Sequence, residues 1–185
     1  MKIQEARVCA VCVATDPRHF VTATVPQVSL EFGGIPGDRH FGLTKRASGR
    51  ESNYPHGATI FNRRQITAVS LEECRLIAKI LSIPLLSPNW LGANLVLEGI
   101  FDLTDLPMGC RLLFPSGAGL LCEGRNTPCI HAARAVQAHY PDRPTLAKEF
   151  IAAAAGHRGI FCIVERPGIL FTEDKVKIVW ERSFR

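Results

Sequence analysis

The stretch IFCIVERPGILFTEDKVKIVW, residues 160–180, decides the fold class of this chain. It contains three short apolar runs, at residues 160–165, 168–171 and 175–180, which are separated by an Arg-Pro-Gly turn and a Glu-Asp turn. In the last run, apolar side chains recur at every second position and so share one face. Short apolar runs bounded by turn residues are typical of β-strands. The C-terminal part of the chain is therefore predicted to be β-sheet.

Comparable strand patterns recur towards the N-terminus. They lie at residues 6–14, 28–32, 60–69, 90–99 (a tight turn that leads into a strand), 111–114 and 119–123. About eight or nine short strands without a regular strand-helix-strand alternation favour a closed sheet over a parallel one. We therefore expect a mainly β (α+β) fold, a closed or nearly closed β-barrel with about three peripheral helices.

The helices have recognisable start and stop signals. Ser70 and Glu73 form a capping box at the start of the first helix. The second helix follows Pro128, and the third runs from a cap at Thr145 to Gly156. These helices have apolar faces that would pack against the barrel.

Composition limits the class of protein. The chain has 185 residues, of which 46% are hydrophobic, so we expect a single domain over residues 1–185. Seven cysteines without framework spacing, and no apolar signal core after Met1, indicate a reduced, cytoplasmic protein. No apolar run approaches the roughly 20 residues that span a bilayer, so no membrane association is expected.

The basic residues suggest an anionic small-molecule partner. The net charge is +5, and we count 16 Arg among the 22 basic residues. Arginine forks bind phosphate or carboxylate through two hydrogen bonds, which favours a phosphate-bearing cofactor or substrate. Aromatic residues make up only 8% of the chain and do not alternate with a basic stripe, so nucleic acid is not expected as a partner.

Two loops are candidates for a ligand site. Residues 33–42 are rich in glycine and place Asp38, Arg39 and His40 at their tip, where they would line a site unless the segment is an ordinary connection. Residues 43–58 are polar and basic and are predicted to form a mobile loop, either a functional lid or a solvated excursion.

Cys129 is the candidate reactive residue. With Thr127 as N-cap and Pro128 in the first helical position, Cys129 would lie in the first turn of a helix. The positive end of the helix dipole favours a thiolate there, and Arg125 and His131 are close in sequence. The alternative is an inert buried cysteine. The Cys9-x-x-Cys12 pair is a weaker candidate for a metal or redox site, because residues three apart on a strand point to opposite faces.

Five motifs in order resemble the MOSC domain family, the molybdenum-cofactor sulfurase C-terminal domain, as a small stand-alone member. They are Gly37-Asp38-Arg39-His40, Arg64-Gln65-Ile66-Thr67, Gly92-Ala93-Asn94-Leu95, Pro128-Cys129 and Arg158-Gly159, within a resemblance that covers about residues 25–180. The sequence departs from the family pattern at Ala93, where glutamate is common, at Glu173, where glycine is common, and in the longer basic insertion 43–58.

The resemblance implies a β-barrel that binds a molybdenum–pterin cofactor (molybdopterin), with Cys129 as metal ligand and catalytic residue. It places cofactor binding on the motif residues and their neighbours: Asp38, Arg39, His40, Arg64, Asn94, Arg125, Asn126 and Thr127. A soft thiolate suits molybdenum, and arginines and a helix N-terminus suit the pterin phosphate.

The resemblance leaves three functions open. The first is a molybdenum-dependent reductase of N-hydroxylated or N-oxide compounds, which would need a separate electron-donor protein. The second is a sulfur carrier that accepts persulfide sulfur on Cys129 from a cysteine desulfurase, a partner enzyme that would hold the pyridoxal phosphate. The third is a barrel that senses or stores the cofactor.

Overall fold

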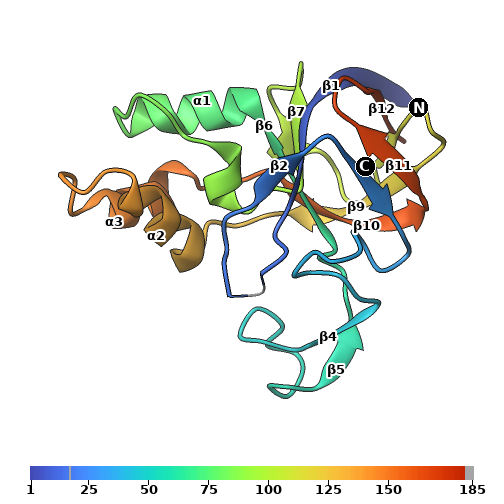
Figure 1. Ribbon diagram of the computed structural model, residues 1–185, viewed down its shortest axis with the longest axis horizontal. Helices are drawn as coiled ribbons and strands as arrows, with labels where there is room; N and C mark the ends of the chain where they lie inside the picture. Colours follow the sequence, from blue (N-terminus) through green and yellow to red (C-terminus); the bar gives the residue numbers. More distant parts are fainter. Residues whose placement is uncertain (17, 182–185) are drawn as a thin grey trace.

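The computed structural model of the chain describes residues 1–16 and 18–181. Seven strands form a closed barrel (Figure 1). Around the barrel, the order is β1 (Lys2–Val13), β12 (Lys175–Trp180), β8 (Arg111–Leu113), β9 (Gly119–Arg125), β10 (Ile160–Arg166), β6 (Ile66–Ser70) and β7 (Leu95–Glu98), which pairs with β1 again. Neighbours are antiparallel except β6 and β7, which are parallel. The predicted mainly β barrel with three helices is confirmed.

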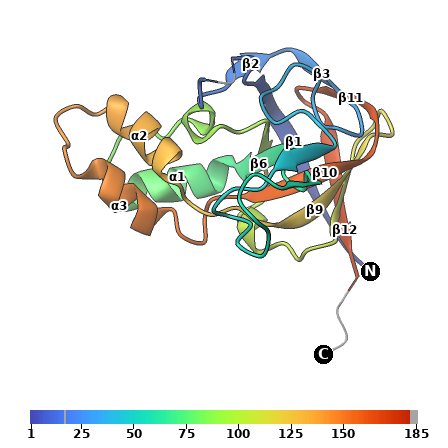
Figure 2. The same ribbon diagram turned by 90° about the horizontal axis from the view of Figure 1, so that it is seen from below.

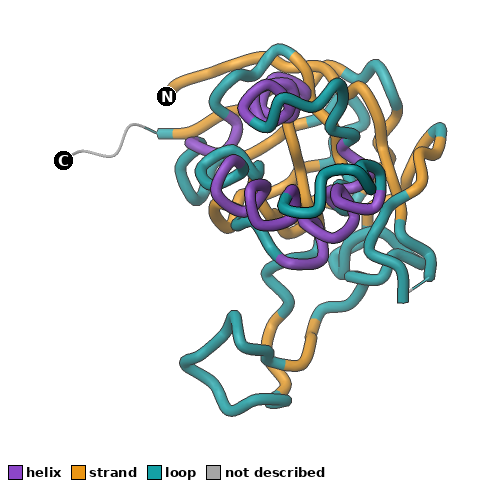
Figure 3. The backbone as a smooth tube through the Cα atoms, turned by 90° about the vertical axis from the view of Figure 1, so that its left-hand side faces the viewer, coloured by secondary structure: helices purple, strands orange, loops and turns teal. Residues whose placement is uncertain are grey.

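Two smaller sheets and one added strand complete the β-structure. Strand β2 (Ala23–Val25) pairs with β1, and β3 (Gln27–Leu30) pairs with β11 (Gly168–Phe171). The hairpin of β4 (Thr44–Arg46) and β5 (Thr59–Phe61) projects away from the barrel, as Figures 1 and 3 show. The basic segment expected to be irregular over 43–58 therefore begins in a strand and forms the connection of this hairpin.

The single strand predicted at residues 60–69 is two strands, β5 and β6. Between them, side-chain amides add to the backbone bond from the Asn62 N–H to the Leu43 carbonyl: Asn62 Nδ2 donates to the carbonyl oxygens of His40 at 2.8 Å and Gly42 at 3.1 Å. Gln65 Nε2 donates to the Phe32 carbonyl at 2.9 Å. These bonds turn the chain out of the hairpin and into the barrel.

Alternate residues of the barrel strands point inwards and form the first core. These buried side chains are Ala6, Val8, Val11, Ile66, Ala68, Leu95, Leu97, Leu112, Leu120, Cys122, Ile160, Cys162, Val164, Val176 and Ile178. Side chains fill the interior, so the barrel is a rigid support and a ligand must bind at its surface or rim.

The helices form a layer on one side of the barrel, at the left of Figure 1 and again beside the sheet in Figure 2. They are α1 (Leu71–Ile80), α2 (Ile130–Ala138) and α3 (Leu146–Ala153), with short 3₁₀ turns η1 (Pro88–Leu91) and η2 (Leu103–Asp105). A second core between helices and barrel includes Ile77, Val136 and Phe150. Within the described ranges, no helix is long and apolar enough to cross a membrane.

A bulge in β1 overturns the expected placement of Cys9 and Cys12. The register shifts between Val8 and Ala10, so Val8 and Val11 face the barrel interior while Cys9, Ala10 and Cys12 pack with the helix layer. An extra residue in a bulge reverses the inside-outside alternation beyond it. Both cysteines therefore lie on the same side of the strand, contrary to the prediction from a regular strand.

The two single-residue departures from the family pattern, at Ala93 and Glu173, have a structural counterpart. Ala93 is fully buried in the second core, where a glutamate would need a partner. Glu173 has φ of 73°, in the left-handed region that favours glycine, and its carboxylate pairs with Arg7.

The N-terminus of α1 is tied to the rest of the molecule through a buried carboxylate. Ser70 Oγ accepts from the Glu73 N–H at 3.2 Å, as the capping box predicts. The Glu73 carboxylate instead accepts from Thr104, from N at 2.8 Å and from Oγ1 at 2.9 Å, and burial raises its pKa. Thr104 Oγ1 in turn accepts from the Gly159 N–H at 2.7 Å. One hydroxyl thus connects α1, η2 and the start of β10.

Replacement of Thr104 by valine tests this connection. Thr104→Val keeps the side-chain shape but leaves the Gly159 N–H and one Glu73 oxygen without their partner in a buried place. We expect a loss of about 2–3 kcal/mol in the free energy of unfolding, measured by urea denaturation. Thr172→Val, at a partly exposed turn, is the matched control and should change stability by less than about 0.5 kcal/mol. Equal stability of the two variants would contradict the proposed connection.

Candidate functional site

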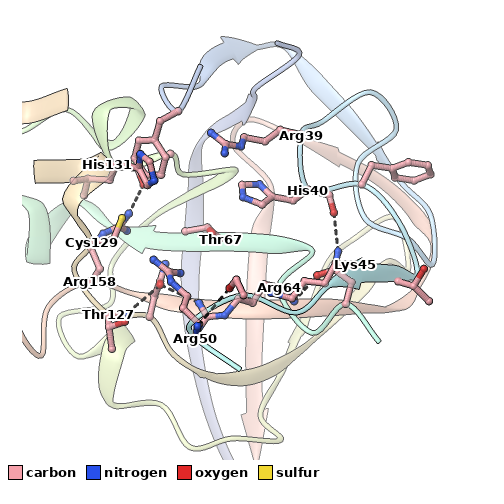
Figure 4. A pocket seen from close by; sticks show the side chains of 18 residues that line it. Arg39, His40, Lys45, Arg50, Arg64, Thr67, Thr127, Cys129, His131 and Arg158 are labelled. Carbon is pink, nitrogen blue, oxygen red and sulfur yellow. Dashed lines mark hydrogen bonds between the residues drawn. The ribbon is translucent and has the colours of Figure 1, made fainter. Parts of the chain in front are cut away.

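A cavity of about 440 Å³ lies where the loop 37–42, the β4–β5 hairpin and the start of α2 meet (Figure 4). Of the site residues predicted from sequence, six line it: Arg39, His40, Arg64, Asn126, Thr127 and Cys129. These residues come from three separate parts of the chain, and the barrel brings them together.

Asp38 and Asn94 lie behind the cavity wall and hold it in place. Asp38 is buried, and its carboxylate accepts from the Ala14 N–H at 2.9 Å, from the His40 N–H at 2.8 Å and from Asn94 Nδ2 at 3.0 Å. Burial alone would raise the pKa of Asp38, but hydrogen bonds from His40 and Ala14 outweigh it and lower the pKa. Asn94 Oδ1 accepts from the Thr67 N–H at 3.0 Å. Both residues therefore position the loop and strand that carry His40 and Thr67.

Arg125 lies outside the cavity. Its guanidinium is largely exposed and pairs with Asp105 at 2.9 Å. Strand β9 extends to Arg125, which pairs with Ile160 of β10, and its side chain is held at the surface by Asp105.

Cys129 is the N-cap of α2, and the helix begins at Ile130, two residues later than predicted from Thr127 as N-cap. The prediction that Cys129 lies within the first turn is therefore wrong. The chain stays extended for longer because the Asn126 N–H donates to the Gly159 carbonyl at 2.8 Å and Asn126 Oδ1 accepts from the Thr127 N–H at 3.0 Å. Cys129 is partly exposed. It still lies at the positive end of the helix, beside the first-turn N–H groups that lack helical partners.

Arg158 forms the floor of the cavity beside Cys129 (Figure 4). It is 2% exposed, and its Nη2 donates to the Leu91 carbonyl. Its Nε and Nη1 have no hydrogen-bond partner in the described part of the chain. Burial lowers the pKa of Arg158 to about 10. The thiolate form of Cys129 acts in the opposite direction and raises this pKa. A buried guanidinium with two free donor nitrogens is an incomplete anion site.

Gly159 fixes the position of Arg158. It has φ of 73°, and a Cβ at this position would lie 2.0 Å from the Ala68 carbonyl oxygen. Only glycine permits this close approach of β10 to β6. The neighbouring Arg158 is thereby held at the start of β10, under the cavity.

Positive charge dominates the cavity. Arg39, Lys45, Arg50, Arg64 and Arg158 line it, whereas no Asp or Glu of residues 1–16 and 18–181 does. Burial is the main cause of a lowered pKa at Arg64, and the charge of Arg50 adds to it. The charge of Arg50 also acts to lower the pKa of Arg158. Arg50 thus repels both other guanidinium groups, and a bound anion would relieve this repulsion.

Rings and hydrogen bonds fix the orientation of several of these groups. The Arg64 guanidinium lies 3.9 Å from the ring centroid of Phe161, and its Nη1 donates to Asn126 Oδ1 at 3.3 Å. On the opposite wall, Arg39 Nη1 donates to the His19 carbonyl at 2.9 Å, and Phe20 stacks on His131 with ring centroids 6.0 Å apart.

Sequence reasoning assigned no binding or catalytic role to several lining residues: Lys45, Arg50, Thr67, His131 and Arg158. Arg158 belongs to the Arg158-Gly159 family motif, an arginine directly before a glycine at the start of an apolar strand, but that motif was not assigned to the site. Lys45 and Arg50 belong to the basic segment, whose path depends on the β4–β5 pairing, and no local pattern shows that they line the same cavity as Cys129.

The protein side chains alone do not form a metal-binding cluster here. Within the part that the structure describes, no group of three or more His, Cys, Asp or Glu side chains is placed to hold a metal ion. A metal at Cys129 would therefore need further ligands from a cofactor, and the surrounding cations suit a cofactor with negative charge.

Comparisons with known proteins agree with this architecture. The family model described as the MOSC domain matches residues 36–177. A Bacillus subtilis protein, YuaD, whose name links it to metal-sulfur cluster biosynthesis, is 52% identical over 163 residues, which are 88% of this chain and 85% of that protein. The crystal structure of Bacillus subtilis YuaD superposes with a TM-score of 0.95 at 48% identity, covering 97% of this chain and 99% of that one.

A more distant solved structure shares the fold. YiiM from Geobacillus stearothermophilus superposes with a TM-score of 0.63 at 15% identity, covering 95% of this chain and 75% of that one. At this identity the likeness concerns the barrel and its helices alone.

Inorganic phosphate provides a direct test of the anion site. At about 100 times its dissociation constant, phosphate should stabilise the protein by about 2.7 kcal/mol, which raises the unfolding midpoint by roughly 5–10 °C. Arg158→Met should lose most of this rise. Without phosphate, its free energy of unfolding should change by less than about 1 kcal/mol, because the variant also removes an incompletely paired buried charge.

The matched control is Arg111→Met, which removes a surface guanidinium paired with Glu165 outside the cavity. It should keep the full response to phosphate. An undiminished rise in Arg158→Met, measured by thermal unfolding followed by circular dichroism, would exclude Arg158 as the anion-binding group.

Proposed function

The chain belongs to the MOSC domain family, and we propose that it binds a molybdenum–pterin cofactor in this cavity, with Cys129 as the thiolate ligand to the metal. The observation that carries the proposal is the buried, incompletely paired guanidinium of Arg158 beside Cys129. A soft thiolate next to a fixed positive charge suits a soft metal that carries anionic oxygen or sulfur ligands.

The other lining residues have distinct roles in this proposal. Arg50 and Arg64 would hold the pterin phosphate, with the first N–H groups of α2 as additional donors. The cofactor, when bound, would supply oxygen-atom abstraction. His40 and His131 line the same cavity and are the candidates to deliver protons.

We propose reduction of N-hydroxylated or N-oxide compounds as the reaction class. Converting an N-hydroxyl group to an amine consumes two electrons and two protons and releases one water. The electrons would come from a separate donor protein and the protons from the histidines or solvent. The small-molecule substrate would bind in the cavity between the hairpin and the loop 37–42, which both contribute lining residues.

Cofactor content decides this proposal. Protein purified from cells that make molybdenum cofactor should contain molybdenum, by elemental analysis, and release a fluorescent pterin on denaturation. Cys129→Ser should lower the molybdenum content at least about tenfold, because the hydroxyl is a poor ligand for a soft metal.

Cys9→Ser is the matched control, since Cys9 is also a partly exposed thiol but lies outside the cavity. It should keep the wild-type metal content. If wild-type protein contains neither molybdenum nor pterin, the cofactor proposal fails. If it contains both but reduces no N-hydroxylated compound, a storage or sensing role takes its place.

A sulfur-carrier function is the second candidate, and the name of the Bacillus subtilis relative favours it. The Cys129 thiolate would attack the outer sulfur of a persulfide on a partner cysteine desulfurase, which holds pyridoxal phosphate. A new sulfur–sulfur bond forms on Cys129, and the partner's cysteine leaves as a thiolate, so the transfer involves no net oxidation. The partly exposed position of Cys129 and the nearby cations support this reaction.

The carrier function predicts labile sulfur on one residue. After incubation with a cysteine desulfurase and cysteine, wild-type protein and Cys9→Ser should release about one equivalent of sulfur to cyanide, and Cys129→Ser should release almost none. Equal sulfur release from all three proteins would rule out Cys129 as the acceptor.

A further inference from the structure

A second cavity, of about 340 Å³, lies directly beside the first one. Lys45, Arg50 and Arg64 line both cavities and form the boundary between them. A ligand whose reactive end lies near Cys129 could therefore extend past these side chains into the second cavity. The function proposed above assigns no role to that cavity.

The second cavity has a different chemical character from the first. Its walls include the rings of Tyr54, Phe61 and Phe161, together with the polar side chains of Ser52 and Asn53. Tyr54 and Phe61 are 56% and 52% exposed, and together with Phe161 they line one cavity, so their rings are accessible to a ligand there. Exposed ring faces beside hydrogen-bonding groups suit a flat heterocycle.

The charges place an anion at the boundary. In the second cavity, Lys45 pairs with Glu51 at 2.6 Å, and Arg63 pairs with Glu123. Arg50 and Arg64 are then the cations of this cavity without a carboxylate partner among residues 1–16 and 18–181. Arg64 is already oriented by its contact with Phe161. A phosphate at the boundary would meet two guanidinium groups, with the aromatic rings on its far side.

From this arrangement, we propose that the second cavity binds a nucleoside monophosphate unit. The base lies against Tyr54 and Phe61, and the phosphate lies between Arg50 and Arg64. The inference deepens the proposed function by naming a second part of the ligand. The nucleotide could be attached to the pterin cofactor, whose phosphate would then share Arg50 and Arg64 with it, or be a free molecule that binds these two groups in place of the pterin phosphate. Both sources share this chemistry.

Calorimetric titration of the full-length protein with GMP, CMP and AMP tests the proposal, with ribose 5-phosphate as a probe that lacks the base. At least one nucleotide should bind about tenfold more tightly than ribose 5-phosphate, because each base stacked on an aromatic ring contributes that much or more. Nucleotides that bind no more tightly than ribose 5-phosphate would overturn the proposal.

Variants locate the binding to the second cavity. Phe61→Leu and Tyr54→Leu keep apolar bulk but remove a ring face, and each should weaken nucleotide binding about tenfold without changing the affinity for ribose 5-phosphate. Phe101→Leu, at a ring that is 74% exposed outside both cavities, is the matched control and should bind as the wild type does. Arg50→Gln should weaken binding of the nucleotide but not of the nucleoside. Unchanged binding in all three cavity variants would contradict the proposed site.

Two further measurements separate this inference from the proposed function. Cys129→Ser should keep its nucleotide affinity even where it loses molybdenum. If the wild-type protein contains no pterin but still binds the nucleotide, the cofactor proposal fails and the nucleotide site stands. Mass spectrometry of the small molecules released on denaturation identifies the source. A pterin that carries a nucleotide indicates an extended cofactor, and a free nucleotide indicates a separate ligand.

Discussion

The burial of the Arg158 guanidinium is the constraint on which the candidate site depends. Removing a charge from water is costly, and proteins usually offset that cost with a carboxylate or with a complete set of hydrogen bonds. Here one carbonyl oxygen, from Leu91, is the partner, and other cations surround the group. The fold holds this unfavourable charge in place through Gly159, which cannot be replaced without a clash with the Ala68 carbonyl. An arrangement that is poor for stability and rigidly held is typical of a ligand site.

The barrel makes this possible because its filled interior does not deform. Arg158 is set by β10, Cys129 by the junction of β9 and α2, and the loop with Arg39 and His40 is held by Asp38 and Asn94 behind it. The second core fastens α2 to the barrel, so the positive end of that helix keeps its direction. The site is thus built on rigid elements, apart from one wall.

Much of the fold follows from local pattern, and less of the site does. Strand alternation, the Ser70 cap and the turn signals predict most elements and the barrel class. The β1 bulge and the break at residues 62–65 depend on contacts with distant residues, which local periodicity cannot show. Cys129 was selected because its chemistry depends on its sequence neighbours. Arg50 and Arg158 were named in the sequence but given no site role, because their places in the site arise where separate parts of the chain meet.

The remaining wall, the β4–β5 hairpin, stands away from the barrel on two strands (Figure 3). Three paired positions join its strands, and an isolated two-stranded hairpin is only marginally stable in water. The hairpin carries Lys45 and Arg50, so a bound anion would stabilise its folded conformation, and the folded hairpin would in turn stabilise the bound anion. The residence time of a ligand should therefore depend on how often this hairpin opens, which is independent of the unfolding of the barrel. Substitutions in the hairpin could then change the rate of ligand exchange without altering the chemistry at Cys129.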